Sequence, residues 1–231
     1  GQGLVGWIRR LPWGDPSLVA QLLAMLTFVL GGITGLVNAS FTVNQVVHNT
    51  TWVPGHFHMT VGSAVALTFM GVAYWLVPYL TGHGLWSRKL ALVQAWLYTI
   101  GVFVFARGMI SGGLRGMPRR TFIAEATYSL PGWHLAGIIT AIGGSLMFLG
   151  ALLFLWILLM TVLRGSATEP VPQDVPYSEV LTAPAQTGWE VRLDQLRWWV
   201  LAAVVLIVIA YGPAFAAQLP PHLVSPGYRL Y

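Results

Sequence analysis

The sequence predicts an all-α membrane protein, a bundle of about five transmembrane helices. The chain has 231 residues, of which 56% are hydrophobic and only 8% are charged, whereas a soluble domain is about 25% charged. Three long stretches, 16–87, 126–163 and 198–228, contain no Asp, Glu, Lys or Arg. One span needs roughly 20 apolar residues. The stretches therefore accommodate about two, one and one spans, and residues 90–106 supply a fifth.

The first helix is expected at residues 17–39, after the helix-start signal Asp15-Pro16-Ser17. Its Gly31, Gly32 and Gly35 are expected to let another helix approach closely, and helix packing is a sufficient explanation for them.

The second helix is expected at residues 53–80, after a polar connector at 41–52. Pro54 suits the first turn of this helix, because the missing N–H of a proline has no intrahelical partner there.

Three further helices are expected at residues 90–110, 133–163 and 198–219. The segment 164–197 holds four prolines and five of the seven acidic residues, which predicts a crossing outside the membrane. We expect residues 1–231 to form one membrane domain. Because the chain opens without an initiator Met or a signal-peptide pattern, it is expected to be a fragment, or to have its N-terminal portion elsewhere.

Charge and cysteine content exclude several classes of function. The net charge of +5 comes from twelve Lys and Arg residues scattered among the spans. Nucleic-acid binding needs a clustered basic face, so no nucleic-acid partner is expected, whereas membrane lipid is. The absence of cysteine excludes disulfides, iron–sulfur clusters and thiolate metal sites. Histidine is left as the residue to bind a soft metal or a haem.

Two histidines, His56 and His58, stand just inside the second helix. Successive residues of an α-helix turn by about 100°, so these two side chains point about 200° apart. Histidines that share one metal on a helix are spaced i,i+3 or i,i+4, as in zinc proteases. The i,i+2 spacing therefore indicates two cofactors on opposite flanks of one helix. The alternative for His56 alone is a hydrogen-bonded intramembrane histidine.

Helix counting places the connector between the first two helices and the connector after the third helix on the same face, called side B. The opposite face, side A, holds a modest excess of Lys and Arg, which predicts that side A is cytoplasmic and side B faces outside. Side A carries seven basic residues: Arg9, Arg10, Arg88, Lys89, Arg164, Arg192 and Arg197. Side B carries five: Arg107, Arg115, Arg119, Arg120 and Arg229.

Arg119 and Arg120 lie on side B, where the histidine pair also begins its helix. Adjacent arginines at a membrane pair with anions, and the guanidinium group suits carboxylates. A haem carries two propionates, so iron ligands just below the surface with arginines above them indicate haems standing edge-on in the bundle. The alternative partner for the two arginines is a phospholipid headgroup.

These motifs resemble the catalytic subunit I of haem-copper oxidases, especially the B-type cytochrome c oxidases. The resemblance covers essentially the whole chain, in order and spacing relative to the five spans. It is carried by four segments: Asn38-Ala39-Ser40-Phe41-Thr42, Val46-Val47-His48-Asn49-Thr50, Trp52-Val53-Pro54-Gly55-His56-Phe57-His58 and Met117-Pro118-Arg119-Arg120.

The resemblance implies a role for each motif residue. His56 would be the proximal ligand of a high-spin haem and His58 an axial ligand of a low-spin haem, with Phe57 between them. Arg119 and Arg120 would hold haem propionates.

His48, Asn44 and Asn49 would lie near the propionates and the exit region for water and protons. A-type oxidases carry carboxylates at the positions of the two asparagines. An amide is a weaker ligand for a hard cation, so a magnesium site is doubtful here.

The resemblance also implies a larger assembly around this chain. The chain would be the C-terminal part of a catalytic subunit that reduces oxygen to water with electrons from cytochrome c and couples this to proton translocation. The copper ligands would come from outside this chain, in the N-terminal half of subunit I. A copper-bearing subunit II would dock on side B. The protein would lie in the cell membrane as a multi-pass protein.

Two other functions stay open on the sequence alone. A nitric oxide reductase or a quinol oxidase of the same superfamily would differ in the residues of the missing half. A haem-free membrane transporter or scaffold would line a substrate path with polar residues near the membrane midplane, whereas the polar residues here gather toward side B.

Overall fold

A computed structural model describes residues 6, 8–120, 130–167, 188–193 and 195–218. The chain divides into two units, residues 1–172 and 173–231, and each is described by itself. The prediction of one membrane domain over residues 1–231 stays a prediction.

Among the described residues the regular secondary structure is helical, and β-structure is limited to two isolated bridges between single residues. Five helical stretches in the described part of the chain are long and apolar enough to cross a membrane, which confirms the predicted fold class. The first unit contains, in order, η1 (Ile8–Arg10), α1 (Pro16–Ala39), α2 (Phe41–Val47), α3 (Trp52–Phe57), η2 (His58–Val65), α4 (Ala66–Thr81), α5 (Arg88–Gly113) and α6 (Pro131–Arg164). The second unit contains α7 (Trp189–Leu193) and α8 (Leu196–Gln218).

The predicted helix ends agree with the observed ones to within three residues. The start of α1 follows from its cap, because the Asp15 carboxylate accepts a hydrogen bond from the backbone N–H of Leu18 at 3.0 Å. Ser87 caps α5 in the same way, through the N–H of Leu90 at 3.3 Å. Most of the predicted crossing at 164–197 lies outside the described residues, and α7 is the described helix within it.

The second span is helical from Trp52 to Thr81, close to the predicted bounds, but it is not a uniform α-helix. Residues 58–65 form a π-helix, η2, between α3 and α4. Within and beside this segment, the hydroxyls of Thr60 and Ser63 bond to the carbonyls of His56 and Met59, at 3.2 and 2.9 Å. Those carbonyls are the ones that an α-helix would pair with backbone N–H groups four residues on. A π segment inside an α-helix is frequent at functional sites.

The connector at 41–52 is also more ordered than expected, because it contains the short helix α2. Val47 is fully buried on its inner side. His48 ends the helix, and its backbone N–H bonds to the carbonyl of Asn44 at 2.8 Å.

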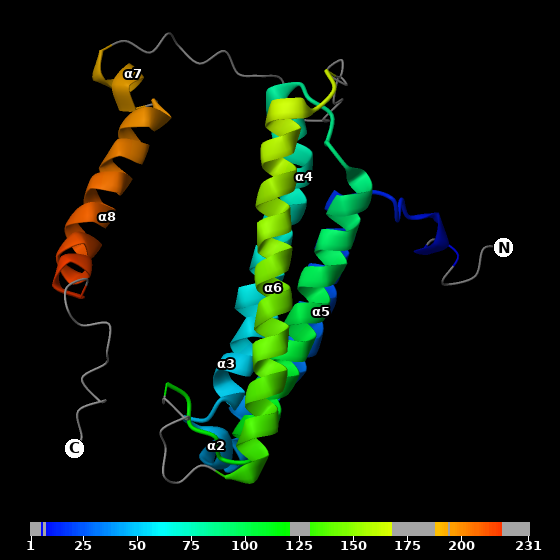
Figure 1. The fold of residues 1–231 in the computed structure, drawn as a ribbon, viewed down its shortest axis with the longest axis vertical. Helices are drawn as coiled ribbons and strands as arrows, with labels where there is room; N and C mark the ends of the chain where they lie inside the picture. Colours follow the sequence, from blue (N-terminus) through cyan, green and yellow to red (C-terminus); the bar gives the residue numbers. More distant parts are fainter. Residues whose placement is uncertain (1–5, 7, 121–129, 168–187, 194, 219–231) are drawn as a thin grey trace. The chain divides into compact units, whose positions relative to one another are not determined.

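Helix α5 is the central element of the first unit. It packs along the length of α6 and also contacts α1 and α3, while α1 packs against η2 and α4 (Figure 1). The α5–α6 contact depends on small residues, since a Cβ on Gly143 would collide with the backbone of Phe105. A buried apolar cluster fills the space between α1, α4 and α5, including Val19, Leu23, Leu67 and Val102.

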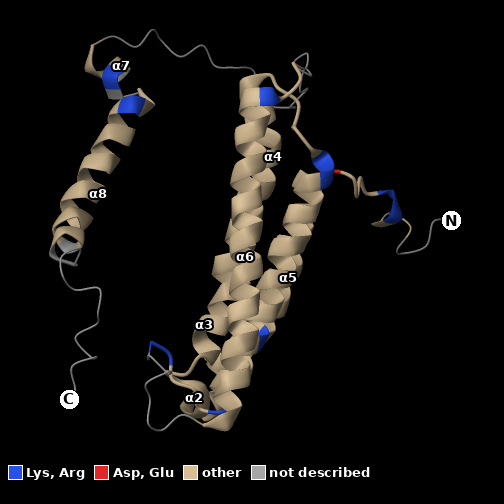
Figure 2. Ribbon diagram, viewed as in Figure 1, with Lys and Arg blue, Asp and Glu red and all other residues tan. Residues whose placement is uncertain are grey.

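The charged residues of the first unit follow the pattern of a spanning bundle. In Figure 2 its Lys and Arg positions lie toward the two ends of the helices, and the middle of the bundle is uncharged. Apolar side chains such as Phe28, Phe69 and Phe148 are exposed on its flanks, as expected of surfaces that face lipid or neighbouring helices. The predicted site residues lie at one of these two ends of the bundle, near α2 and the start of α3.

Candidate functional site

The two connectors predicted to share side B are joined by backbone hydrogen bonds. Thr50 and Pro118 form an isolated antiparallel bridge. The N–H of Thr51 bonds to the carbonyl of Met117 at 2.8 Å, and the N–H of Arg119 bonds to the carbonyl of Asn49 at 3.0 Å. The end of α2 is thereby fixed beside the turn that carries the two arginines. The prediction that these connectors lie on one face is confirmed.

The start of the histidine-bearing helix is held against the end of α5. The Thr51 hydroxyl donates to the carbonyl of Met109 at 2.8 Å. Gly55 is buried where α3 meets α5, and a Cβ there would lie 3.0 Å from side-chain atoms of Met109 and Ile110. This contact sets the direction in which α3 presents the histidines that follow.

His58 is oriented by its own helix. Its Nδ1 lies 2.7 Å from the carbonyl oxygen of Pro54, one turn earlier. A carbonyl oxygen can only accept a hydrogen bond, so Nδ1 carries a proton, and in the neutral imidazole Nε2 is then the nitrogen with the lone pair. The ring also packs on Phe105 of α5, with ring centroids 4.5 Å apart.

A cavity of about 370 Å³ opens beside His58. Arg119 and Arg120 line it together with His58, so the structure brings one predicted metal ligand and both predicted anion-binding residues to one cavity. Phe57 also lines the cavity, and it is 52% exposed. The remaining lining comes from the start of the histidine-bearing helix and from α5: Thr51, Val53, Pro54 and Met109.

His56 is oriented by a different helix, α1. Its Nδ1 lies 3.0 Å from the carbonyl oxygen of Gly31 and 2.9 Å from the hydroxyl oxygen of Thr34. The ring fits over Gly35, where a Cβ would lie 2.9 Å from Cε1 of the imidazole. The glycines of α1 therefore do more than allow helix packing, since Gly35 leaves the room that the His56 ring fills.

The two imidazoles thus contact different helices, as the i,i+2 spacing predicts. His56 faces α1, and His58 packs against α5. Phe57 lies between them in sequence and packs its ring at 5.2 Å from that of His56. Within the described residues, both histidines make their side-chain hydrogen bonds through Nδ1 and neither does so through Nε2. In the same part of the chain, no three His, Asp or Glu side chains could hold a metal ion together.

The arginine turn is held by Asn49. The Arg119 guanidinium donates to the Asn49 side-chain carbonyl at 3.0 Å. Asn49 has φ of +61°, a conformation that asparagine tolerates better than most residues. Arg120 also has φ of +61°, which is costly for a side chain with a Cβ and tends to be kept where a site requires it. The Asn49 amide, which the sequence made a doubtful magnesium ligand, is bonded to an arginine.

His48 and Asn44, the other two predicted site residues of the connector, lie away from the lining of this cavity. His48 is exposed and Asn44 is half-buried, and neither lines the cavity beside His58. Their backbones bond to each other at the end of α2. Their predicted place near propionates stays a prediction.

Some contributing residues carry no recognisable sequence signal. Thr34 and the carbonyl of Gly31 precede His56 by more than twenty residues, and only the packing of α1 on η2 brings them to its ring. The carbonyl of Pro54 could have been inferred, because it is four residues before His58, the distance of one helical turn.

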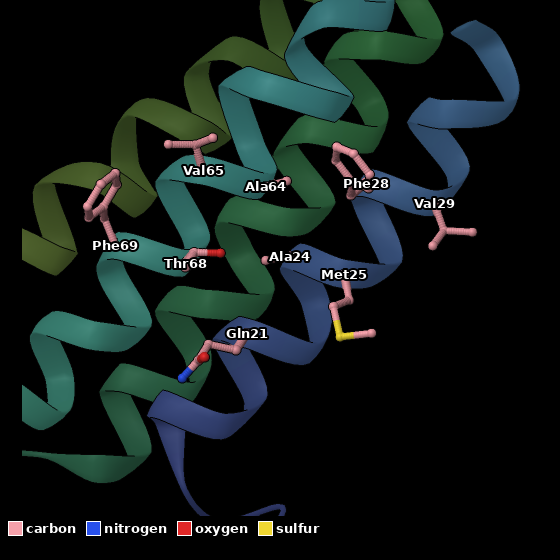
Figure 3. A pocket seen from close by; sticks show the side chains of 9 residues that line it. All are labelled: Gln21, Ala24, Met25, Phe28, Val29, Ala64, Val65, Thr68 and Phe69. Atoms are coloured by element: carbon pink, nitrogen blue, oxygen red, sulfur yellow. The ribbon is translucent and has the colours of Figure 1, made fainter. Parts of the chain in front are cut away.

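A second cavity, of about 450 Å³, lies along α1, η2 and α4. Its lining is almost wholly apolar, with Gln21 and Thr68 as the polar side chains (Figure 3). None of the predicted site residues lines it.

The chain is similar to known proteins over most of its length. A model of the family "Cytochrome C and Quinol oxidase polypeptide I" matches residues 1–146. The cytochrome c oxidase subunit 1 of Thermus thermophilus is 41% identical over 235 aligned residues, which cover all of this chain and 42% of that protein. A probable quinol oxidase subunit 1 of Staphylococcus haemolyticus is 33% identical, over 88% of this chain and 28% of that protein.

A solved haem-copper terminal oxidase dimer is similar in structure. The match has a TM-score of 0.62 and 32% sequence identity, and it covers 86% of this chain and 34% of the solved chain. The chain thus spans less than half the length of these three proteins.

Proposed function

Because the chain belongs to the cytochrome c and quinol oxidase polypeptide I family, we propose that it is the C-terminal part of the catalytic subunit of a respiratory terminal oxidase. In this proposal it supplies one protein ligand to each of two haems. His56 is the ligand of the high-spin haem and His58 is a ligand of the low-spin haem.

The observation that carries the proposal is the way both imidazoles are held. Each is anchored through Nδ1 to a backbone carbonyl, of Gly31 for His56 and of Pro54 for His58. Histidines that bind metals usually donate the other ring N–H to a carbonyl or carboxylate, which fixes the tautomer and the direction of the ring. In both rings this leaves Nε2 as the nitrogen that can bind a metal. The two rings contact different helices.

The residues around His58 suit a haem edge. The cavity offers an imidazole with a fixed tautomer, the exposed ring of Phe57 and two guanidinium groups. Arg119 and Arg120 provide positive charge for two propionates, and Asn49 orients the first of them. When bound, haem iron supplies the electron transfer and oxygen chemistry, while the protein sets ligation, orientation and electrostatics.

The proposed reaction is the reduction of oxygen to water with electrons from cytochrome c, coupled to proton translocation across the membrane. The copper ligands and the second ligand of the low-spin haem come from the N-terminal half of subunit I in this proposal. A copper-bearing subunit II docks on side B, the end of the bundle that holds the arginine turn, and this side faces outside.

A quinol oxidase is the second candidate, and the similarity to the Staphylococcus protein favours it. The reaction at the haem-copper centre would be the same, but the electrons would come from a membrane quinol.

The experiment is to purify the full-length subunit in its assembled complex and measure two properties. The reduced-minus-oxidised spectrum should show separate low-spin and high-spin haem signals. Oxygen consumption should then be faster with reduced cytochrome c than with a reduced quinol at matched concentrations. Faster turnover with quinol would favour the quinol oxidase. A complex without haem would refute both proposed functions.

A further inference from the structure

The hydroxyl of Thr34 lies in a closed hydrogen-bonded group with His56. Its oxygen lies 2.9 Å from Nδ1 of His56. The same hydroxyl bonds to the carbonyl of Gly31 at 2.6 Å, and that carbonyl lies 3.0 Å from Nδ1. Thr34 and His56 are both half-buried. Two acceptor oxygens on α1 thus face one ring nitrogen on α3.

The direction of each bond follows from the chemistry of the three groups. The Gly31 carbonyl can only accept, so Thr34 donates its hydroxyl hydrogen to it and His56 donates from Nδ1. The Thr34 oxygen keeps lone pairs, and one of them can accept from the same Nδ1–H. The Nδ1–H of His56 is therefore shared between the Gly31 carbonyl oxygen and the Thr34 hydroxyl oxygen. A hydroxyl that accepts a hydrogen bond becomes a stronger donor, so the bond from Thr34 to the carbonyl is strengthened in turn.

We infer that Thr34 is a positioning residue for His56, which fixes the ring over Gly35 and raises the electron donation of Nε2 toward a bound metal. The inference rests on the proposed function, because it assumes that His56 is a haem ligand. Acceptors on the distal N–H of a metal-bound histidine raise its basicity. A more basic ligand strengthens the bond to iron and favours the oxidised form.

The helix offers a matched control for this residue. Thr27 is on the same helix and its hydroxyl also bonds to backbone carbonyls of its own helix, at 3.0 and 2.8 Å. No bond from Thr27 to a histidine occurs within the described residues. Thr→Val at either position removes a hydroxyl from α1 with little change of shape, but only position 34 faces His56.

The experiment uses the full-length oxidase complex with Thr34→Val, Thr34→Ser and Thr27→Val. Resonance Raman spectra of the reduced high-spin haem report the iron–histidine stretching frequency, and a redox titration reports its midpoint potential. Thr34→Val should lower the frequency and raise the potential. Thr34→Ser, which keeps the hydroxyl, should restore both values, and Thr27→Val should leave both at the wild-type values.

Three results overturn the inference. Unchanged frequency and potential in Thr34→Val would show that the hydroxyl does not act on His56. Equal changes in Thr34→Ser and Thr34→Val would show a packing effect, and so would equal changes in Thr27→Val. A wild-type complex without a high-spin haem would instead refute the proposed function, so the two failures are distinguishable.

Discussion

The two histidines of one helix are held in different ways. His58 is anchored one turn back along its own helix, on the carbonyl of Pro54. His56 is anchored on another helix, through Gly31 and Thr34 of α1. The first arrangement forms as soon as the local helix forms. The second exists only when α1 packs correctly against the histidine-bearing span.

This difference makes the two sites separable by mutation. Changes on α1 should affect the His56 site and leave the His58 site intact. Changes in the arginine turn should do the reverse, because Arg119 and Arg120 line the cavity beside His58. The two sites are not separable if changes on α1, or changes in the arginine turn, affect the His56 site and the His58 site equally.

The largest effect is expected from removing the imidazoles themselves. His58→Ala should remove the low-spin haem signal and spare the high-spin one, and His56→Ala should remove or strongly perturb the high-spin signal. Oxygen consumption should be lost in both variants, because each breaks the electron path. Optical spectra and haem content of the purified complexes measure this. Survival of both signals in His58→Ala would show that the assignment of His58 is wrong.

The next effect tests the dependence of His56 on α1. Gly35→Ala would place a Cβ 2.9 Å from the His56 ring, and overpacking of this kind costs about 1–3 kcal/mol. The high-spin haem should be lost at a lower temperature than in the wild type, with the low-spin signal unchanged at that temperature. Thermal melts followed at both signals measure this.

Gly32→Ala is the matched control for Gly35→Ala. A Cβ on Gly32 would meet nothing within 4 Å, and replacing a helical glycine by alanine stabilises by up to about 1 kcal/mol. The control should melt at or slightly above the wild-type temperature. Equal destabilisation by the two variants would contradict the role given to Gly35.

A smaller effect is expected at the arginine turn. Arg119→Ala removes a positive charge from the His58 cavity and leaves Asn49 without its partner. Loss of a nearby cation disfavours added electrons, so the low-spin haem potential should fall. A contact between a guanidinium and a propionate is worth on the order of 1 to 4 kcal/mol, and the effect on the potential of the more distant iron should be smaller. A redox titration measures it, and an unchanged potential would favour lipid headgroups as the anions that Arg119 binds.

The smallest effect concerns backbone strain at Arg120. Its φ of +61° costs about 1–2 kcal/mol for a residue with a Cβ, so Arg120→Gly should stabilise the turn by about that amount. The variant should therefore unfold at a higher temperature than Arg120→Ala, which keeps the strain and also lacks the charge. Both should lower the haem potential by the same amount.

Much of this site was predictable from the sequence because helix periodicity and helix counting are local rules. They placed His56 and His58 on different flanks and brought Arg119 to their side of the membrane. The π-helix that begins at His58 was not predicted. Hydroxyls that bond to the carbonyl four residues earlier also occur in α1, α5 and α6, so they do not distinguish this segment in the sequence. Thr34 was missed for another reason, since only the packing of α1 on the second span brings it to the ring.

The bond between Arg119 and Asn49 gives the connector amide a partner that the family resemblance did not suggest. The resemblance suggested comparing Asn49 with a metal-binding carboxylate, and the amide made that site doubtful. The structure gives the amide oxygen a different partner, a guanidinium group. An amide accepts this bond without neutralising the cation, because its oxygen carries no formal charge.

The most direct test of two separate iron sites on one helix is an experimental density map of the full-length complex with its cofactors bound. We predict two porphyrins, one coordinated by Nε2 of His56 and the other by Nε2 of His58, with each Nδ1 still bonded to its backbone carbonyl. Coordination through Nδ1, or a histidine that faces no metal, would contradict this account.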